Sequence, residues 1–112
     1  MSLGVLVENV DDVKALARLF KALSDETRLR LLKLLADQGS EGALCVGALA
    51  GRVGITQSAV SQHLAVLRDA GLVVDERRGY FVHYRLNQAN LSRWRERMRA
   101  TLGEELARAL AG

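Results

Sequence analysis

The side chains with the clearest chemical use lie together in residues 56–62. Hydroxyl and amide groups occupy five of these seven positions: Thr56, Gln57, Ser58, Ser61 and Gln62. Such groups both donate and accept hydrogen bonds. A glutamine can make two bonds to one adenine, and a serine can reach several base edges. The segment therefore favours recognition of DNA bases.

An α-helix over about 57–70 would separate these polar side chains from an apolar face. At about 100° per residue, one side of the helix collects three apolar residues, Val60, Leu64 and Leu67. Ser58 and Gln62 fall on the opposite side, with Gln57 and Ser61 on its flank. One side is thus suited to a core and the other to a polar partner.

The residues before this helix complete a DNA-binding motif. A short helix over 46–52 is expected to stop at Gly54, and Thr56 is the expected N-cap of the next helix. Two helices joined by a tight turn with glycine form a helix-turn-helix. We therefore expect the second helix to enter a DNA major groove, whose width of about 12 Å admits it.

A basic β-hairpin is expected after this motif. Residues 72–75 and 80–86 have the pattern of two short strands around a turn at 76–79. Arg77 and Arg78 lie at the tip, where guanidinium groups can bind phosphates or enter the minor groove. A hairpin in this place is the wing of a winged helix-turn-helix.

His63 lies on the 57–70 helix beside the edge of the apolar face. We include it among the candidate DNA contacts. A single imidazole in this position is more often a packed, hydrogen-bonded residue than a ligand.

Further helices are expected on both sides of the motif. One spans 10–22, a second opens at Asp25 and Glu26, and the last covers about 90–110. The predicted fold class is mainly α with a small β-hairpin, in the order α-α-α-α-β-β-α. All 112 residues fit one domain, 1–112, with helices at both ends for dimerisation.

The amino-acid composition is consistent with a DNA-binding protein but does not by itself identify one. The net charge is +3 and the isoelectric point about 9.5, which satisfies a loose criterion for nucleic-acid binding. A single cysteine permits no intramolecular disulfide and suits a reducing compartment. No secretory signal or membrane-spanning run is visible. The expected location is the cytoplasm, without a membrane partner.

Three segments together resemble the ArsR/SmtB family of repressors. They are LFKALSDETRLRLLKLL at 19–35, GITQSAVSQHLAVLRDAGLV at 54–73 and ERRGYFVHYRL at 76–86. The resemblance covers roughly residues 14–95. It implies a homodimer whose first and last helices pack across a two-fold axis. It also implies repression of a nearby operon, relieved by a signal.

The residues independently favour a dimer. The apolar stripe of the last helix is longer than one small core can cover: Leu91, Trp94, Met98, Leu102, Leu106 and Leu110. Two 57–70 helices in a dimer would meet major grooves about one helical turn apart. The expected partner is therefore double-stranded DNA with a pseudo-palindromic operator.

The resemblance also implies metal sites that this chain lacks. Many relatives carry Cys-x-Cys at the start of the third helix, where this chain has Cys45 and Gly47. Others use Asp and His of the last helices, but residues 87–112 contain no His, Cys or Asp. We therefore expect no metal site and no cofactor.

Cys45 leaves two interpretations open. A thiol near a helix N-terminus can ionise and oxidise readily, so Cys45 could be a redox sensor that loosens DNA binding. Alternatively, it is a small core residue.

Other functional classes are less well supported. No nucleophile with a partner base, glycine-rich phosphate loop or metal cluster indicates an enzyme. A winged-helix protein-interaction module without DNA binding is the other alternative, but it has no need of the polar helix face or the wing arginines. Repression is implied by the resemblance alone, because nothing in the residues distinguishes a repressor from an activator.

Overall fold

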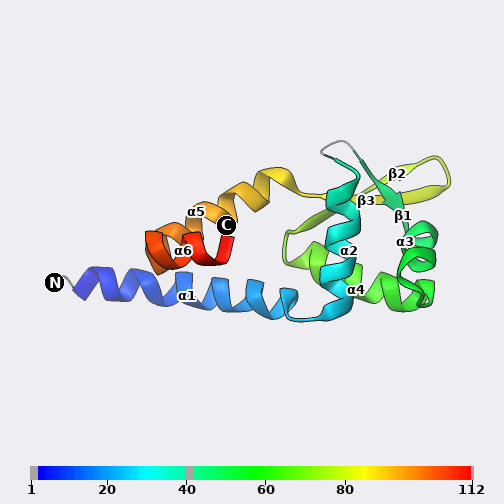
Figure 1. Ribbon diagram of the computed structural model, residues 1–112. Coiled ribbons are helices and arrows are strands. Elements are labelled where there is room, and N and C mark those ends of the chain that lie inside the picture. Colours follow the sequence, from blue (N-terminus) through cyan, green and yellow to red (C-terminus); the bar gives the residue numbers. More distant parts are fainter. Residues whose placement is uncertain (1–2, 40–41, 112) are drawn as a thin grey trace.

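The computed structural model describes residues 3–39 and 42–111, and the side-chain surroundings of 10–39 and 42–110. The helices and strands drawn in Figure 1 follow one another along the chain in this order: α1 (Leu3–Leu23), α2 (Glu26–Asp37), β1 (Leu44–Cys45), α3 (Val46–Val53), α4 (Gln57–Asp69), β2 (Val73–Arg78), β3 (Phe81–Leu86), α5 (Gln88–Leu102) and α6 (Glu104–Ala111). This is a mainly helical winged helix-turn-helix, as predicted.

Side-chain caps set the starts of the central helices. The Asp25 carboxylate accepts a hydrogen bond from the backbone N–H of Arg28, at 3.0 Å, and so begins α2. The Thr56 hydroxyl accepts one from the backbone N–H of Ala59, at 3.1 Å, and so begins α4. Each bond satisfies a backbone donor that has no partner inside the helix. Both helix starts agree with the sequence prediction.

The predicted hairpin is part of a three-stranded sheet in the order β1-β3-β2. The additional strand β1 pairs antiparallel with β3, placing Leu44 opposite Tyr84 and Cys45 opposite His83. Two residues are too few to show the alternation that predicts a strand. The wing is also longer than predicted, because β2 continues to Arg78 and leaves only Gly79 and Tyr80 in the turn.

The prediction of a single C-terminal helix over about 90–110 is wrong, because the helix is broken at Gly103. This residue has φ +91°, a left-handed conformation that glycine adopts without strain. The break separates α5 from α6, which turns back and lies beside α5 in Figure 1. At the other end of the chain, α1 begins seven residues before the predicted residue 10, at Leu3.

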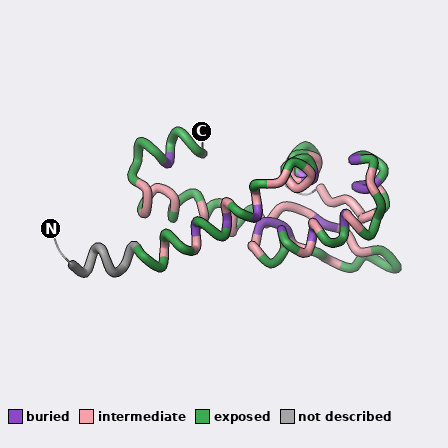
Figure 2. The backbone as a smooth tube through the Cα atoms, turned by 90° about the horizontal axis from the view of Figure 1, so that it is seen from below, coloured by how far each residue is buried: buried purple, intermediate pink, exposed green. Residues whose placement is uncertain are grey.

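The core lies where α2, α3 and α4 meet the sheet. Its eight most deeply buried side chains are all aliphatic: Leu31, Leu35, Leu49, Val60, Leu64, Leu67, Leu72 and Val73. Figure 2 shows most of the buried residues in this half of the molecule, with a few more along α1 and one in α6. Burying an aliphatic side chain contributes about 1.5–3 kcal/mol, so these residues hold α4 and the wing in fixed relation.

Helices α1, α5 and α6 form an arm that projects from the core (Figure 1). The molecule is elongated, with extents of 55 × 24 × 24 Å. Four apolar side chains of the arm stay about half exposed: Val10 (51%), Val13 (50%), Leu106 (48%) and Leu110 (55%). None of the described helices is long and apolar enough to cross a membrane.

Candidate nucleic-acid interface

Helix α4 has one buried face and one exposed polar face. Val60, Leu64 and Leu67 are 0% exposed and pack in the core. The predicted polar row is exposed throughout: Gln57, Ser58, Ser61 and Gln62. The helix therefore presents hydrogen-bonding side chains outward on a rigid support, the arrangement that reading base edges requires.

The turn before α4 fixes how this face is presented. Gly54 ends α3 in the left-handed conformation, with φ +81°. Its backbone N–H and that of Ile55 both donate to the Ala50 carbonyl, at 2.8 and 3.3 Å. Because α3 is itself anchored by buried Leu49 and Val53, the two helices form a rigid helix-turn-helix.

Thr56 and His63 differ from the exposed row. The Thr56 hydroxyl is exposed but already bound to the start of α4. The half-buried His63 faces α2, where its Nδ1 lies 3.3 Å from Nη1 of Arg28 and 3.9 Å from the Asp25 carboxylate. The structure thus brings together four of the six candidate residues of this segment, and places His63 between α4 and α2.

The charges around Asp25 stabilise its ionised form. The backbone N–H of Arg28 is the strongest influence holding the pKa of this carboxyl below its ordinary value, although partial burial opposes it. The positive charge of Arg28 acts in the same direction as the N–H, and so does His63 when it is protonated. Asp25 therefore serves both as a cap and as a charged link between α2 and α4.

The wing is attached to α4 by an ion pair. Nη1 of Arg68 lies 3.5 Å from the Asp75 carboxylate in β2. Arg78 donates to Glu76 of its own strand, with 2.9 Å between Nε and Oε1. Arg77 is exposed, and among the described residues no acid pairs with it. Of the two predicted wing arginines, Arg77 is thus the one left available to a phosphate.

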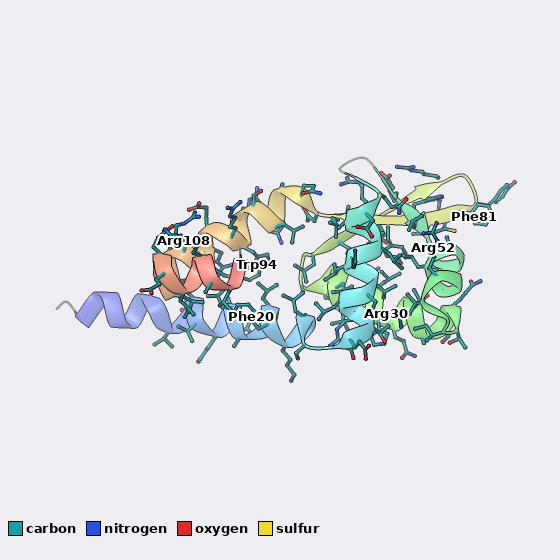
Figure 3. The ribbon with its side chains drawn as sticks, in the orientation of Figure 1. Phe20, Arg30, Arg52, Phe81, Trp94 and Arg108 are labelled. Atoms are coloured by element: carbon teal, nitrogen blue, oxygen red, sulfur yellow. The ribbon has the colours of Figure 1, made fainter. Side chains whose placement is uncertain are left out.

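Sequence reasoning missed the aromatic tip of the wing. Tyr80 is 95% exposed and Phe81 64% exposed, and Figure 3 shows Phe81 projecting from the end of the hairpin. Gly79, at φ +64°, forms the turn with Tyr80. The sequence feature that could have predicted this tip is the adjacent pair Tyr80 and Phe81, which follows Arg77, Arg78 and Gly79.

Cys45 lies at the junction of β1 and α3. It is half-buried, and its side chain makes no capping bond to α3. It is paired across the sheet with His83, whose Nδ1 is buried and has no hydrogen-bond partner among the described residues. No three metal-binding side chains come together within 3–39 and 42–111.

Comparisons with known proteins agree with this geometry. Residues 25–74 match the bacterial regulatory proteins of the arsR family. The chain is 46% identical to the arsenical resistance operon repressor of Escherichia coli K12 over 70 residues, which are 62% of this chain and 57% of that protein. It is 45% identical over 83 residues to the arsenic resistance transcriptional regulator ArsR2 of Pseudomonas putida, which are 74% of this chain and 70% of that protein.

A solved structure supports the same relationship. It is the homodimeric winged helix-turn-helix DNA-binding domain of a possible ArsR-family regulator from Mycobacterium bovis, with a TM-score of 0.64 and 33% identity. The superposition covers 73% of this chain and 72% of that one. Regulatory proteins, not enzymes, make up the matching family. The chain therefore belongs to the ArsR family of bacterial transcriptional regulators.

Proposed function

We propose that this chain is a sequence-specific DNA-binding repressor whose α4 enters the major groove. The observation that carries the proposal is the exposed polar row of α4, opposite a face that is 0% exposed. Gln57 and Gln62 have the groups for paired bonds to adenine, and Ser58 and Ser61 can reach other base edges. The related E. coli protein is named an operon repressor, which supports repression in this chain.

The other candidate residues take supporting roles. Thr56 holds the start of α4, and His63 fixes the helix against Arg28 of α2. In the wing, Arg77 binds a phosphate or enters the minor groove, and Arg78 does so in competition with Glu76. These contacts contribute affinity and position more than base specificity.

A homodimer completes the DNA-binding unit. We infer that residues 1–112 act as one winged helix-turn-helix domain whose terminal helices dimerise. The half-exposed Val10, Val13, Leu106 and Leu110 supply an apolar surface for this contact, and the M. bovis relative is homodimeric. Two copies of α4 would then face a pseudo-palindrome with half-sites about 34–36 Å apart. Acting on chromosomal DNA places the protein in the cytoplasm.

The proposal is tested by fluorescence anisotropy with DNA from upstream of the protein's own gene. We expect binding at least about 1,000-fold tighter than to a shuffled duplex, with affinity falling steeply as salt increases. Equal affinity for both duplexes would exclude sequence-specific recognition, and the absence of salt-dependent binding to either duplex would instead indicate a winged-helix module that binds proteins.

A redox function of Cys45 is a second candidate, favoured by its position at the start of α3, opposite His83. The buried Nδ1 of His83 makes no hydrogen bond to any described residue, Cys45 included, so we infer that the thiol proton is released to water. The thiolate would attack one oxygen of hydrogen peroxide, break the O–O bond, and leave a sulfenic acid and water. We expect peroxide to weaken operator binding by the wild type and not by Cys45→Ser. Equal sensitivity of both proteins would show that Cys45 is structural.

A further inference from the structure

A groove lies where α1, α2 and α5 meet the C-terminal end of α4. One part, of about 460 Å³, lies among α1, α2 and α4, and an adjoining part, of about 280 Å³, lies among α1, α4 and α5. Arg18, Asp69 and Ala70 line both parts, so we treat them as one site, the junction groove. Its size falls in the range of small-molecule sites, about 300–1,000 Å³.

The junction groove combines apolar walls with basic side chains. Ala22, Val66 and Ala70 line the larger part, and Trp94 lines the smaller. Figure 3 shows Trp94 between α5 and α1. Four of the lining residues are basic, Arg18, Lys21, Arg28 and Arg97, and one is acidic, Asp69.

Three of these five charges are already bound within the protein. Arg97 lies over the Trp94 ring, at 4.6 Å, and pairs with Asp12, at 3.5 Å. The Asp69 carboxylate lies 3.8 Å from Nε of Arg68. Arg28 bonds to the end of α1 and to His63.

Arg18 and Lys21 are the exceptions. Both are exposed, and neither has an ion-pair partner among the residues that the structure describes. They are three residues apart on α1, so they lie on the same face of that helix. Together they place two available positive charges at the edge of the groove.

Helix ends account for these two charges only in part, through the position of Lys21 in the last turn of α1. The helices α1 and α4 both finish at the groove, and cations near C-terminal carbonyls are ordinarily stabilising. However, the carbonyls of Lys21 and Ala22 already accept bonds from the Arg28 side chain. Those of Val66, Arg68 and Leu67 accept the backbone N–H groups of Ala70, Gly71 and Leu72, respectively.

We propose that the junction groove binds a small organic anion with an apolar body, such as an aromatic carboxylate, and that this anion is an effector of DNA binding. Its carboxylate pairs with Arg18 and Lys21, and its body lies on Ala22 and Val66. Because the walls belong to α4 and to the arm, a bound molecule changes the angle between them. The anion-binding site stands on the groove alone, whereas its effect on DNA rests on the proposed function.

Intrinsic fluorescence provides the first test, since Trp94 is the only tryptophan and lines the groove. The full chain is titrated with 4-tert-butylbenzoate and with the neutral 4-tert-butylbenzamide. We expect a saturable change with the acid and at least about tenfold weaker binding of the amide, because the amide lacks the charge-assisted hydrogen bonds. Equal affinity for the two probes, or no response to the acid, would overturn the proposal.

Substitutions on α1 test whether the anion binds at Arg18 and Lys21. The double variant Arg18→Gln, Lys21→Gln should lose the preference for the acid, whereas Lys14→Gln, an exposed position of α1 outside the groove, should keep it. Unchanged acid binding by the double variant would place the anion elsewhere and refute the assignment. Thermal melting of each variant confirms that it is folded.

Measurements of operator binding, with and without the acid, distinguish failure of the anion site from failure of the proposed repressor function. We expect the acid to weaken operator binding by the wild type and not by the double variant. Loss of DNA affinity and of salt dependence in the double variant without any acid would make Arg18 and Lys21 phosphate contacts, and would overturn the effector site. A fluorescence response in a protein that binds no DNA would instead refute the repressor function and keep the anion site.

Discussion

The side-chain amide of Asn90 donates a hydrogen bond to the backbone carbonyl of Gly71, with 2.8 Å between Nδ2 and O. Gly71 ends α4 at φ +76°, and Asn90 lies in the first turn of α5. The bond therefore joins the end of the proposed DNA-reading helix to the start of a proposed dimerisation helix. A Cβ at residue 71 would collide with the Asn90 amide.

We expect Gly71→Ala to lower the free energy of unfolding by about 1–3 kcal/mol, because it combines a left-handed backbone with this collision. Urea denaturation followed by circular dichroism measures the loss. The matched control is Gly51→Ala in α3, where no atom beyond the local backbone lies within 4 Å of a new Cβ. There the substitution should stabilise the helix by up to about 1 kcal/mol. Equal effects of the two changes would contradict the structural role of Gly71.

Removing one polar side chain of α4 should reduce specificity. We expect Gln62→Ala to weaken operator binding by about 1–3 kcal/mol while leaving non-specific binding unchanged, because an amide reads bases and carries no charge. Anisotropy with operator and shuffled duplexes gives both affinities. The exposed Gln88 of α5 provides a control, since Gln88→Ala should change neither affinity. Parallel loss on both duplexes would argue against base contact by Gln62.

The two wing arginines should differ in their response to salt. Arg77→Ala should reduce the slope of log affinity against log salt by about 1, as loss of one phosphate contact does. Arg78→Ala should reduce it less, because Arg78 is bound to Glu76. Affinities measured at several salt concentrations give the slopes. Identical slopes for the wild type and Arg77→Ala would exclude a phosphate contact by this residue.

Charges placed on the exposed apolar surface of the arm should prevent dimerisation. We expect the double variant Leu106→Glu, Leu110→Glu to sediment as a monomer and to bind the operator much more weakly, because each partner would bring two like charges to an apolar contact. Leu29→Glu in α2 is the control, since Leu29 is similarly exposed (51%) but lies outside the arm. A double variant that remains dimeric would require a different interface.

The link made by Asp25 predicts a dependence of stability on acid pH. Its pKa is lower in the folded protein than the ordinary value of 3.8, so its charge stabilises the fold above that pH. This contribution is lost as the pH falls below 3.8 and through the folded value. We expect Asp25→Asn, which keeps a capping group, to be less stable than the wild type near neutral pH. The difference measured by urea denaturation should shrink in acid, and a constant difference would contradict the prediction.

The sequence predicted the local elements that carry the proposed site. Thr56 as the cap of α4, and the separation of Val60 and Leu64 from Ser58 and Gln62, are observed in the structure. These features depend on helical geometry and on bonds between residues three or four positions apart. Helical periodicity did not separate α5 from α6, because the apolar stripe continues past Gly103 on both sides of the break.

Contacts between residues far apart in the sequence depend on the packing of the whole chain. The tertiary structure placed Cys45 opposite His83 and His63 against Arg28. It also folded α1 and α5 against the end of α4, which forms the junction groove. Hydrophobic periodicity specifies that a helix has a buried face but does not identify the element that covers it, because burial of apolar area is non-directional. The partners of these residues were therefore set by how the whole chain packs.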